Sequence, residues 1–269
     1  MLTWAVQAGL IAQNPVANLV PLPQRESTKV YRPRALSEAE ITRFLEAARA
    51  DDRVCAERVA AVKTIEKGTK GAQWARRARS PRVPQAALWQ AFVETGARYG
   101  ELTRIAWHDI DFERRVLVLR AENTKSGRER MIPLRDALVV ELLALRAAHA
   151  GVLARVPSKH DRVFLTPEGR PWPVYTTNTM RIFDRLLEAA GIDRIDPSGR
   201  KLDIHALRHS FASRLSRTNA GLVQAQRLLG HSDPKLTAQI YTHLDVEDLR
   251  SAIDGLGPRP KQAADESAA

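Results

Sequence analysis

The sequence predicts a mainly α-helical protein with a small antiparallel β-sheet, an α+β fold. Apolar residues recur at helical spacing in most segments of the chain. Strand-like, β-branched patterning is confined to the stretch between residues 111 and 134. With 269 residues, of which 44% are hydrophobic, the chain is long enough to bury a sizeable core.

The first 35 residues differ from those that follow. Residues 1–20 are predicted to form one helix that stops at Asn14-Pro15. Its apolar face is already present at the first residues, which indicates the last helix of a preceding domain. Residues 21–35 hold three prolines among polar and basic residues, a composition typical of a linker. A capping box from Ser37 to Glu40 then begins a compact domain, expected to span residues 36–256.

The middle of this domain is predicted to change from helix to strand. A buried helical pattern over residues 85–108 is broken at Gly96 and Gly100, with Arg98 between them. A strand follows over residues 111–119, and two further short strands meet around residues 125–127 and end at residue 134. The tip of this hairpin would carry Lys125, which could reach away from the sheet towards a ligand.

The last third of the domain is predicted to be helical. The expected helices span residues 136–150, 176–190, 203–215, 221–229, 235–242 and 246–256. Residues 257–269 lack an apolar face and are predicted to form a disordered tail.

Net charge and residue usage restrict the class of protein. The 42 Lys and Arg exceed the 31 Asp and Glu by 11, which favours a polyanionic partner. Cys55 is the only cysteine, so an intrachain disulfide and a cysteine-based zinc site are excluded. No apolar run approaches the length of about 18 residues that a membrane helix needs, and residues 1–20 do not resemble a signal peptide. We therefore expect a cytoplasmic protein.

Much of the positive charge lies in one segment. Residues 51–86 are expected to be a basic insertion, and residues 63–82 alone hold seven basic residues and one acidic residue, with Trp74 among them. Such a run is either a solvated surface segment or a contact to the DNA backbone. The candidate DNA-binding residues within it are Lys70, Arg76, Arg77, Arg79 and Arg82.

The stretch from Asp203 to Leu215 concentrates chemically active side chains. His205, Arg208 and His209 share one helix face, and Asp203 is a plausible N-cap that would place His205 in the first turn. A neutral imidazole and a guanidinium beside a helix N-terminus suit a phosphate. Taken alone, the pattern also fits an ordinary helix with one core histidine and two surface cations. Zinc bound by the two histidines would need a third ligand.

A set of separate motifs decides between these interpretations. They are Thr95-Gly-Ala-Arg-Tyr-Gly-Glu-Leu102, Thr124-Lys-Ser-Gly127, His205-Ala-Leu-Arg-His209, Leu228-Leu-Gly-His231 and Tyr241-Thr-His243. In this order, across about 150 residues, they resemble the tyrosine recombinases of the phage integrase family. The resemblance implies the catalytic-domain fold of DNA breaking-rejoining enzymes, with residues 1–20 as the end of a core-binding domain that is otherwise missing.

The resemblance also implies a site and a reaction. The implied catalytic residues are Arg98, Lys125, His205, Arg208, His231 and the nucleophile Tyr241. Two guanidiniums would clamp the nonbridging oxygens of a DNA phosphodiester while the tyrosine attacks. Lys125 would protonate the departing 5′-hydroxyl and leave a 3′-phosphotyrosine. Because that bond conserves the phosphodiester energy, rejoining would need no ATP, and no metal ion or other cofactor is expected.

Supporting roles and partners follow from the same resemblance. Glu101 would position Arg98, and His209 would steady its helix. The partners would be double-stranded DNA and further copies of the chain, as a tetramer at synapsis in which the helix at 246–256 packs on a neighbour. The expected function is site-specific recombination or integration by a mobile element. The alternatives are a truncated DNA-binding remnant and a type IB topoisomerase-like nick-and-reseal enzyme.

Overall fold

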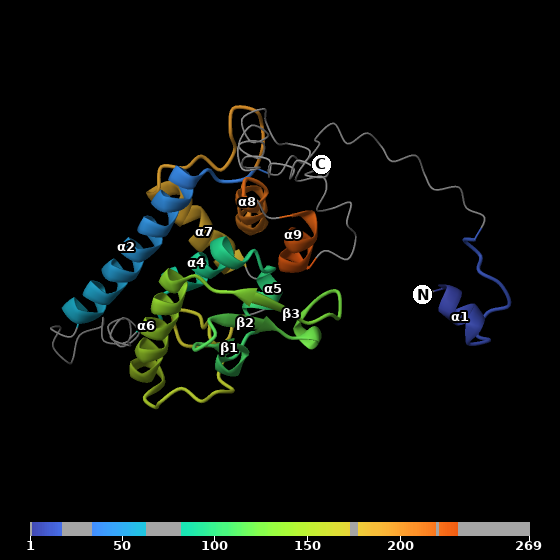
Figure 1. The fold of residues 1–269 in the computed structure, drawn as a ribbon, viewed down its shortest axis with the longest axis horizontal. Coiled ribbons are helices and arrows are strands. Elements are labelled where there is room, and N and C mark those ends of the chain that lie inside the picture. Colours follow the sequence, from blue (N-terminus) through green and yellow to red (C-terminus); the bar gives the residue numbers. More distant parts are fainter. Residues whose placement is uncertain (1, 18–33, 63–81, 173–176, 219–220, 231–269) are drawn as a thin grey trace, which may run out of the picture. The chain divides into compact units, whose positions relative to one another are not determined.

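The computed structural model describes residues 2–17, 34–62, 82–172, 177–218 and 221–230 (Figure 1). The chain divides into two units, residues 1–32 and 33–269. The predicted helices at 235–242 and 246–256, the tail, and most of the predicted linker lie outside the described residues. Among the described residues, no helix is long and apolar enough to cross a membrane.

The described residues of the first unit, 2–17, contain one short helix, α1 (Leu2–Gln7). The prediction of a helix as far as Asn14 is therefore too long. Gly9 adopts a φ of +68°, which a right-handed helix cannot continue through, and Leu10 donates its N–H to the carbonyl of Ala5 instead.

The second unit is mainly helical, as predicted. Its α-helices are α2 (Glu38–Val62), α4 (Ala86–Thr95), α5 (Tyr99–Leu102), α6 (Asp136–Leu153), α7 (Thr177–Ala189), α8 (Ile204–Ser216) and α9 (Leu222–Leu229). Two short 3₁₀ helices, η1 (Trp107–Asp109) and η2 (Ala121–Asn123), flank the strands. The predicted capping box begins α2: Ser37 donates its N–H to Glu40 at 2.9 Å, and Glu40 donates its N–H to the Ser37 hydroxyl at 3.3 Å.

Helix α4 lies at the centre of this unit and packs against α2, α6 and α8 (Figure 1). All of its residues except Glu94 are buried, and apart from Gln90 and Thr95 the buried residues are apolar. Trp89 of α4 contacts Phe44 of α2 and Phe183 of α7, with ring centroids 5.7 and 5.9 Å apart. Each such buried aromatic side chain contributes on the order of 2–3 kcal/mol to the core. The core therefore holds α4 firmly, and with it the residues that directly follow.

The predicted small sheet is present and antiparallel, but its strands differ from the prediction. The single strand expected over residues 111–119 is two strands joined by a turn, and one strand rather than two follows before residue 134. Strands β1 (Ile110–Asp111), β2 (Val116–Leu119) and β3 (Arg130–Pro133) lie in the order β1-β2-β3. Leu119 pairs with Arg130, and directly opposed residues point to the same face. Leu119 is fully buried, so the sheet carries Arg130 into the protein interior together with Ile132.

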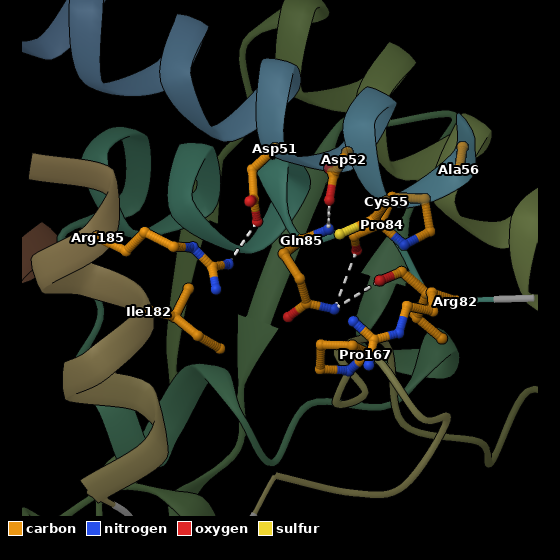
Figure 2. Close-up of a pocket in the computed structure, with 11 residues that line it drawn as sticks. Asp51, Asp52, Cys55, Ala56, Arg82, Pro84, Gln85, Pro167, Ile182 and Arg185 are labelled. Atoms are coloured by element: carbon orange, nitrogen blue, oxygen red, sulfur yellow. Dashed lines mark hydrogen bonds and ion pairs between the residues drawn. The ribbon is translucent and has the colours of Figure 1, made fainter. Parts of the chain in front are cut away.

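The start of the segment expected to be an insertion continues α2 and is tied to the core (Figure 2). The carboxylate of Asp52 accepts the backbone N–H groups of Gln85 and Ala86, both at 2.8 Å, and thereby caps the first turn of α4. Asp51 pairs with Arg185 of α7 at 2.6 Å. Burial, partly offset by the two backbone N–H groups, raises the pKa of Asp52 to about 6. Residues 63–81, which hold most of the basic side chains, lie outside the described residues.

Candidate functional site

The end of α4 positions the first candidate residue, Arg98. Helix α4 stops at Gly96 with a φ of +58°, and a Cβ there would lie 2.3 Å from the ring of Phe211 on α8, so only glycine fits. Two residues later the backbone is extended at Arg98, which is the N-cap of α5. Glu101 accepts both the backbone N–H of Arg98 at 2.9 Å and its guanidinium Nη1 at 3.0 Å. The side chain of Arg98 keeps 27% of its surface exposed, so one carboxylate fixes it at the edge of the protein.

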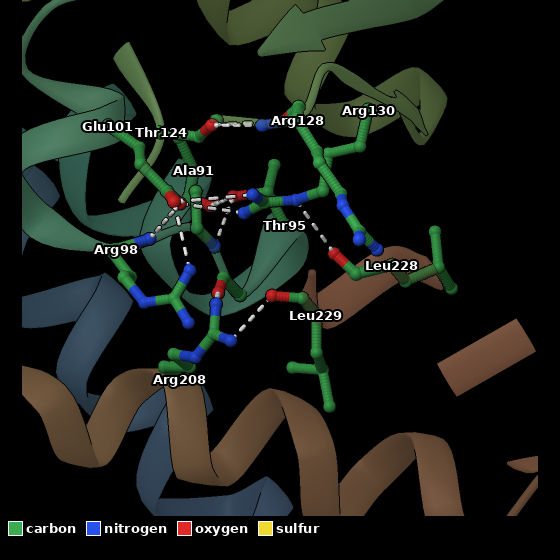
Figure 3. A network of polar contacts seen from close by, with 12 residues as sticks. Ala91, Thr95, Arg98, Glu101, Thr124, Arg128, Arg130, Arg208, Leu228 and Leu229 are labelled. Atoms are coloured by element: carbon green, nitrogen blue, oxygen red, sulfur yellow. Dashed lines mark hydrogen bonds and ion pairs between the residues drawn. The ribbon is translucent and has the colours of Figure 1, made fainter. Parts of the chain in front are cut away.

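A second arginine, which sequence reasoning missed, shares the carboxylate of Glu101. Arg130 of β3 donates Nη2 to Oε2 at 2.6 Å and Nη1 to Oε1 at 3.2 Å, a bidentate pair (Figure 3). The side chains of Arg130 and Glu101 are only 8% and 2% exposed. Arg130 alternates with the buried Ile132 along β3, and an arginine at an inward-facing strand position needs a buried acidic partner. This alternation along the strand is the sequence signal from which a buried Arg130 could have been predicted.

Helix α8 supplies Arg208. The helix begins at the predicted cap, where the carboxylate of Asp203 accepts the N–H of Ala206 at 2.9 Å. Arg208 is 5% exposed and donates Nη1 to the carbonyl oxygen of Gly96 at 2.6 Å and Nη2 to that of Leu229 at 2.5 Å. It therefore joins the end of α4 to the end of α9. Figure 3 shows Arg98 and Arg208 extending towards each other below Glu101.

The resulting cluster has an excess of positive charge. The guanidiniums of Arg98 and Arg130 both bind the carboxylate of Glu101, and Arg208 lies close enough for its charge to interact with all three groups. Burial alone would raise the pKa of Glu101, but the hydrogen bonds and charge of Arg130, followed by Arg98, lower it to about 2. Burial, and then the charges of Arg98 and Arg130, lower the pKa of Arg208 to about 9, so it is still protonated at neutral pH. A bound anion would relieve this repulsion.

The two histidines of α8 lie beside the cluster. Their rings meet edge to face with centroids 5.2 Å apart. Desolvation lowers the pKa of His205, and His209, Arg208 and Arg98 add to this effect, while Asp203 opposes it. Desolvation also lowers the pKa of His209. Both rings are therefore neutral at physiological pH, so His205 can donate or accept one proton near an anion.

Lys125 is exposed in the connection between β2 and β3. The hydroxyl of Thr124 shapes this connection by donating to the carbonyls of Ala121 and Arg128, and Gly127 closes the turn with a φ of +62°. Lys125 is thus exposed in a hairpin connection, as predicted, but the strands that flank it are β2 and β3 rather than two further strands after residue 119.

Of the remaining predicted site residues, the structure describes only Arg82. His231, Tyr241, Lys70, Arg76, Arg77 and Arg79 lie outside the described residues. Arg82 is exposed and pairs with Glu168 at 3.3 Å, a surface ion pair that leaves it accessible. Within the described part of the chain, no three His, Cys, Asp or Glu side chains approach one another closely enough to hold a metal ion, so the His205 and His209 pair finds no third ligand there.

The fold and the site together define an α+β protein with a cluster of three arginines and one carboxylate, and with two histidines beside it, an arrangement with an excess of positive charge. Comparison with known proteins identifies the family. Residues 73–248 match the model of the phage integrase family. Tyrosine recombinase XerC from Corynebacterium efficiens is 30% identical over 259 residues, which cover 96% of this chain and 68% of that protein. The chain belongs to the phage integrase family.

Solved structures show the same fold. The crystal structure of XerA recombinase superimposes with a TM-score of 0.56 at 24% identity, covering 87% of this chain and 68% of that one. The Tn1549 transposon integrase in complex with transposon right-end DNA gives a TM-score of 0.55 at 19% identity, covering 95% and 75%. The chain spans about half the length of several other curated relatives that it matches.

Proposed function

We propose that this protein is a site-specific DNA recombinase that cleaves and rejoins strands through a covalent 3′-phosphotyrosine on Tyr241. The observation that carries the proposal is that Arg98 and Arg208, 110 residues apart in the chain, come together at the end of α4. Arg208 donates to the carbonyl of Gly96, two residues before Arg98, and the carboxylate of Glu101 holds Arg98. This is the arrangement needed to clamp the nonbridging oxygens of a phosphodiester, where negative charge accumulates during attack. XerA is a recombinase, and the Tn1549 integrase was solved in complex with transposon DNA, which supports the same class of partner.

Each remaining residue has a role in this proposal. A phenol with a pKa near 10 is a weak nucleophile at neutral pH, so Tyr241 needs the positive cluster and a proton acceptor. His205, neutral beside Arg208, provides proton transfer or a hydrogen bond, and His231 donates to the phosphate. Lys125, at the exposed hairpin, protonates the 5′-hydroxyl that leaves. Guanidiniums stabilise the charge throughout, and the reaction uses neither ATP nor metal.

A trapping assay tests the proposal. A duplex carrying a recombination site, with a nick near the scissile bond, releases a short fragment after cleavage and prevents rejoining. The wild-type protein is expected to form a protein–DNA adduct that survives denaturation, while Tyr241→Phe forms none. His243→Ala serves as the matched control two residues away and retains adduct formation. If the wild-type protein forms no adduct on any integrase-type site, the chain is a DNA-binding remnant and the proposal is wrong.

A second assay separates recombination from the topoisomerase-like alternative. With two labelled duplexes, a recombinase produces exchanged strands, whereas a nick-and-reseal enzyme only relaxes a supercoiled circle. We propose that exchange takes place in an assembly of several copies on double-stranded DNA. Cross-linking on DNA at increasing protein concentration would measure that assembly.

A further inference from the structure

Arg130 connects the carboxylate of Glu101 directly to the end of α9. Besides its bidentate pair with Glu101, its Nε donates to the carbonyl oxygen of Leu228 at 3.1 Å. Leu228 and Leu229 are the last two residues of α9. Arg130 donates to the carbonyl oxygen of Leu228, and Arg208 donates to that of Leu229 (Figure 3). Carbonyls at a helix C-terminus have no partner within the helix, so these arginines satisfy and orient them.

The packing around Arg130 permits little movement. Gly230 caps α9 with a φ of +63°, and a Cβ at this position would lie 2.7 Å from Nη1 of Arg130. Arg130 therefore fits between the carboxylate of Glu101 on one side and the C-terminal turn of α9 on the other. His231 is the next residue after Gly230.

We propose that Arg130 is a positioning residue. It holds Arg98, through Glu101, in a fixed arrangement with the C-terminal end of α9, which His231 follows in the sequence. The inference rests on the proposed function, because Arg98 and His231 matter there as phosphate-binding groups. Arg130 itself is buried and donates inward. It acts through the planar fork of its guanidinium, whose donors reach Glu101 and the Leu228 carbonyl at the same time, and which the compact ammonium of lysine cannot reproduce.

The competing explanation is that Arg130 only neutralises a buried charge. A lysine would then serve equally well, since Arg130→Lys keeps one positive charge beside Glu101. Arg128→Lys is the matched control, because Arg128 is an exposed arginine two residues earlier on the same hairpin. Gly230→Ala is a second variant: its methyl group displaces Arg130 from the α9 side, while the number of charged groups is unchanged.

The first measurement compares single-turnover cleavage of two nicked duplexes. One has an ordinary scissile phosphate, and the other a methylphosphonate, in which a methyl group replaces a nonbridging oxygen and less charge needs stabilising. We expect Arg130→Lys and Gly230→Ala to cut the ordinary phosphate at least tenfold more slowly at saturating DNA, and the methylphosphonate less than threefold more slowly. Arg128→Lys leaves both rates unchanged. Equal losses on both substrates, or no loss on either, would overturn the proposal.

The second measurement requires no chemistry, so it separates this proposal from the proposed function. Arginine Nε–Hε signals in ¹⁵N-labelled protein report how each guanidinium is held. In Arg130→Lys, the signals of Arg98 and Arg208 are expected to shift and broaden, while that of Arg194, which pairs with Asp184 elsewhere, stays in place. Unchanged Arg98 and Arg208 signals would overturn the positioning role. Absence of any wild-type adduct, with these shifts present, would overturn the proposed function alone.

Discussion

Arg208 donates to the carbonyl oxygen of Gly96, 112 residues earlier in the chain, at 2.6 Å. This bond brings the C-terminal end of α4 against α8, and therefore brings Arg98, two residues beyond Gly96, beside Arg208. The close approach is possible only because residue 96 has no side chain.

Gly96→Ala tests this approach directly. The added methyl group would meet Phe211 at 2.3 Å, and alanine is disfavoured at a φ of +58°, so we expect a loss of about 2 kcal/mol or more in the free energy of unfolding. Urea denaturation followed by circular dichroism measures it. Gly100→Ala is the control: it has no atom within 4 Å of the added methyl and lies within helix α5, so it should be neutral or slightly stabilising. A loss of similar size in both variants would contradict the steric explanation.

Asp203 is expected to act on both the stability of α8 and the pKa of His205. Asp203→Ala removes the cap on Ala206 and should cost about 1 kcal/mol of unfolding free energy. Asp203→Asn can still cap, so it should retain most of that stability. Because the Asp203 charge raises the pKa of His205, both variants should lower that pKa further, as NMR titration of the imidazole would show. A pKa of His205 that rises in either variant would contradict this prediction.

His149 should make folding sensitive to mild acid. It is fully buried on α6 against Trp107, and desolvation lowers its pKa from 6.5 to about 4, with Asp161 opposing. The unfolded chain therefore binds a proton more readily, and stability is lost as the pH falls from about 6.5 towards 4. Between pH 7.5 and 5 this amounts to about 2 kcal/mol. In His149→Leu the difference in unfolding free energy between these two pH values should shrink by about that amount. An unchanged difference would exclude His149 as its source.

The basic segment should contribute to the salt dependence of DNA binding. If Arg76, Arg77, Arg79 and Arg82 contact phosphates, their combined replacement by alanine should reduce the slope of log affinity against log salt concentration by about 3–4. Arg82→Ala alone, which also removes a surface pair with Glu168, should reduce it by about 1 or less. Titrations by fluorescence anisotropy at several salt concentrations measure both slopes. An unchanged slope in the fourfold variant would show that the segment does not lie on the DNA.

Local signals in the sequence were sufficient for most of the elements. The capping box at Ser37, the cap at Asp203 and the breaks at Gly96 and Gly230 each depend on a few neighbouring residues, and the structure has all of them. The length of α1 was overestimated, because a single glycine outweighed the apolar pattern. The continuation of α2 beyond residue 50 depends on Asp51 and Asp52 meeting α7 and α4, partners that are distant in the chain.

The sequence by itself determined the helical class, the small sheet and the motifs that identify the family, because periodicity, caps and spacing are local properties of the chain. Only the tertiary structure decided that one carboxylate, Glu101, serves two arginines, and that Arg130 and Arg208 hold consecutive carbonyls of α9. These contacts join residues 29, 98 and 21 positions apart across separate elements. The alternation along β3 can indicate that Arg130 is buried and needs an acidic partner, because an unpaired buried charge is costly. Which carboxylate becomes that partner depends on proximity in the folded interior, and the local sequence does not specify it.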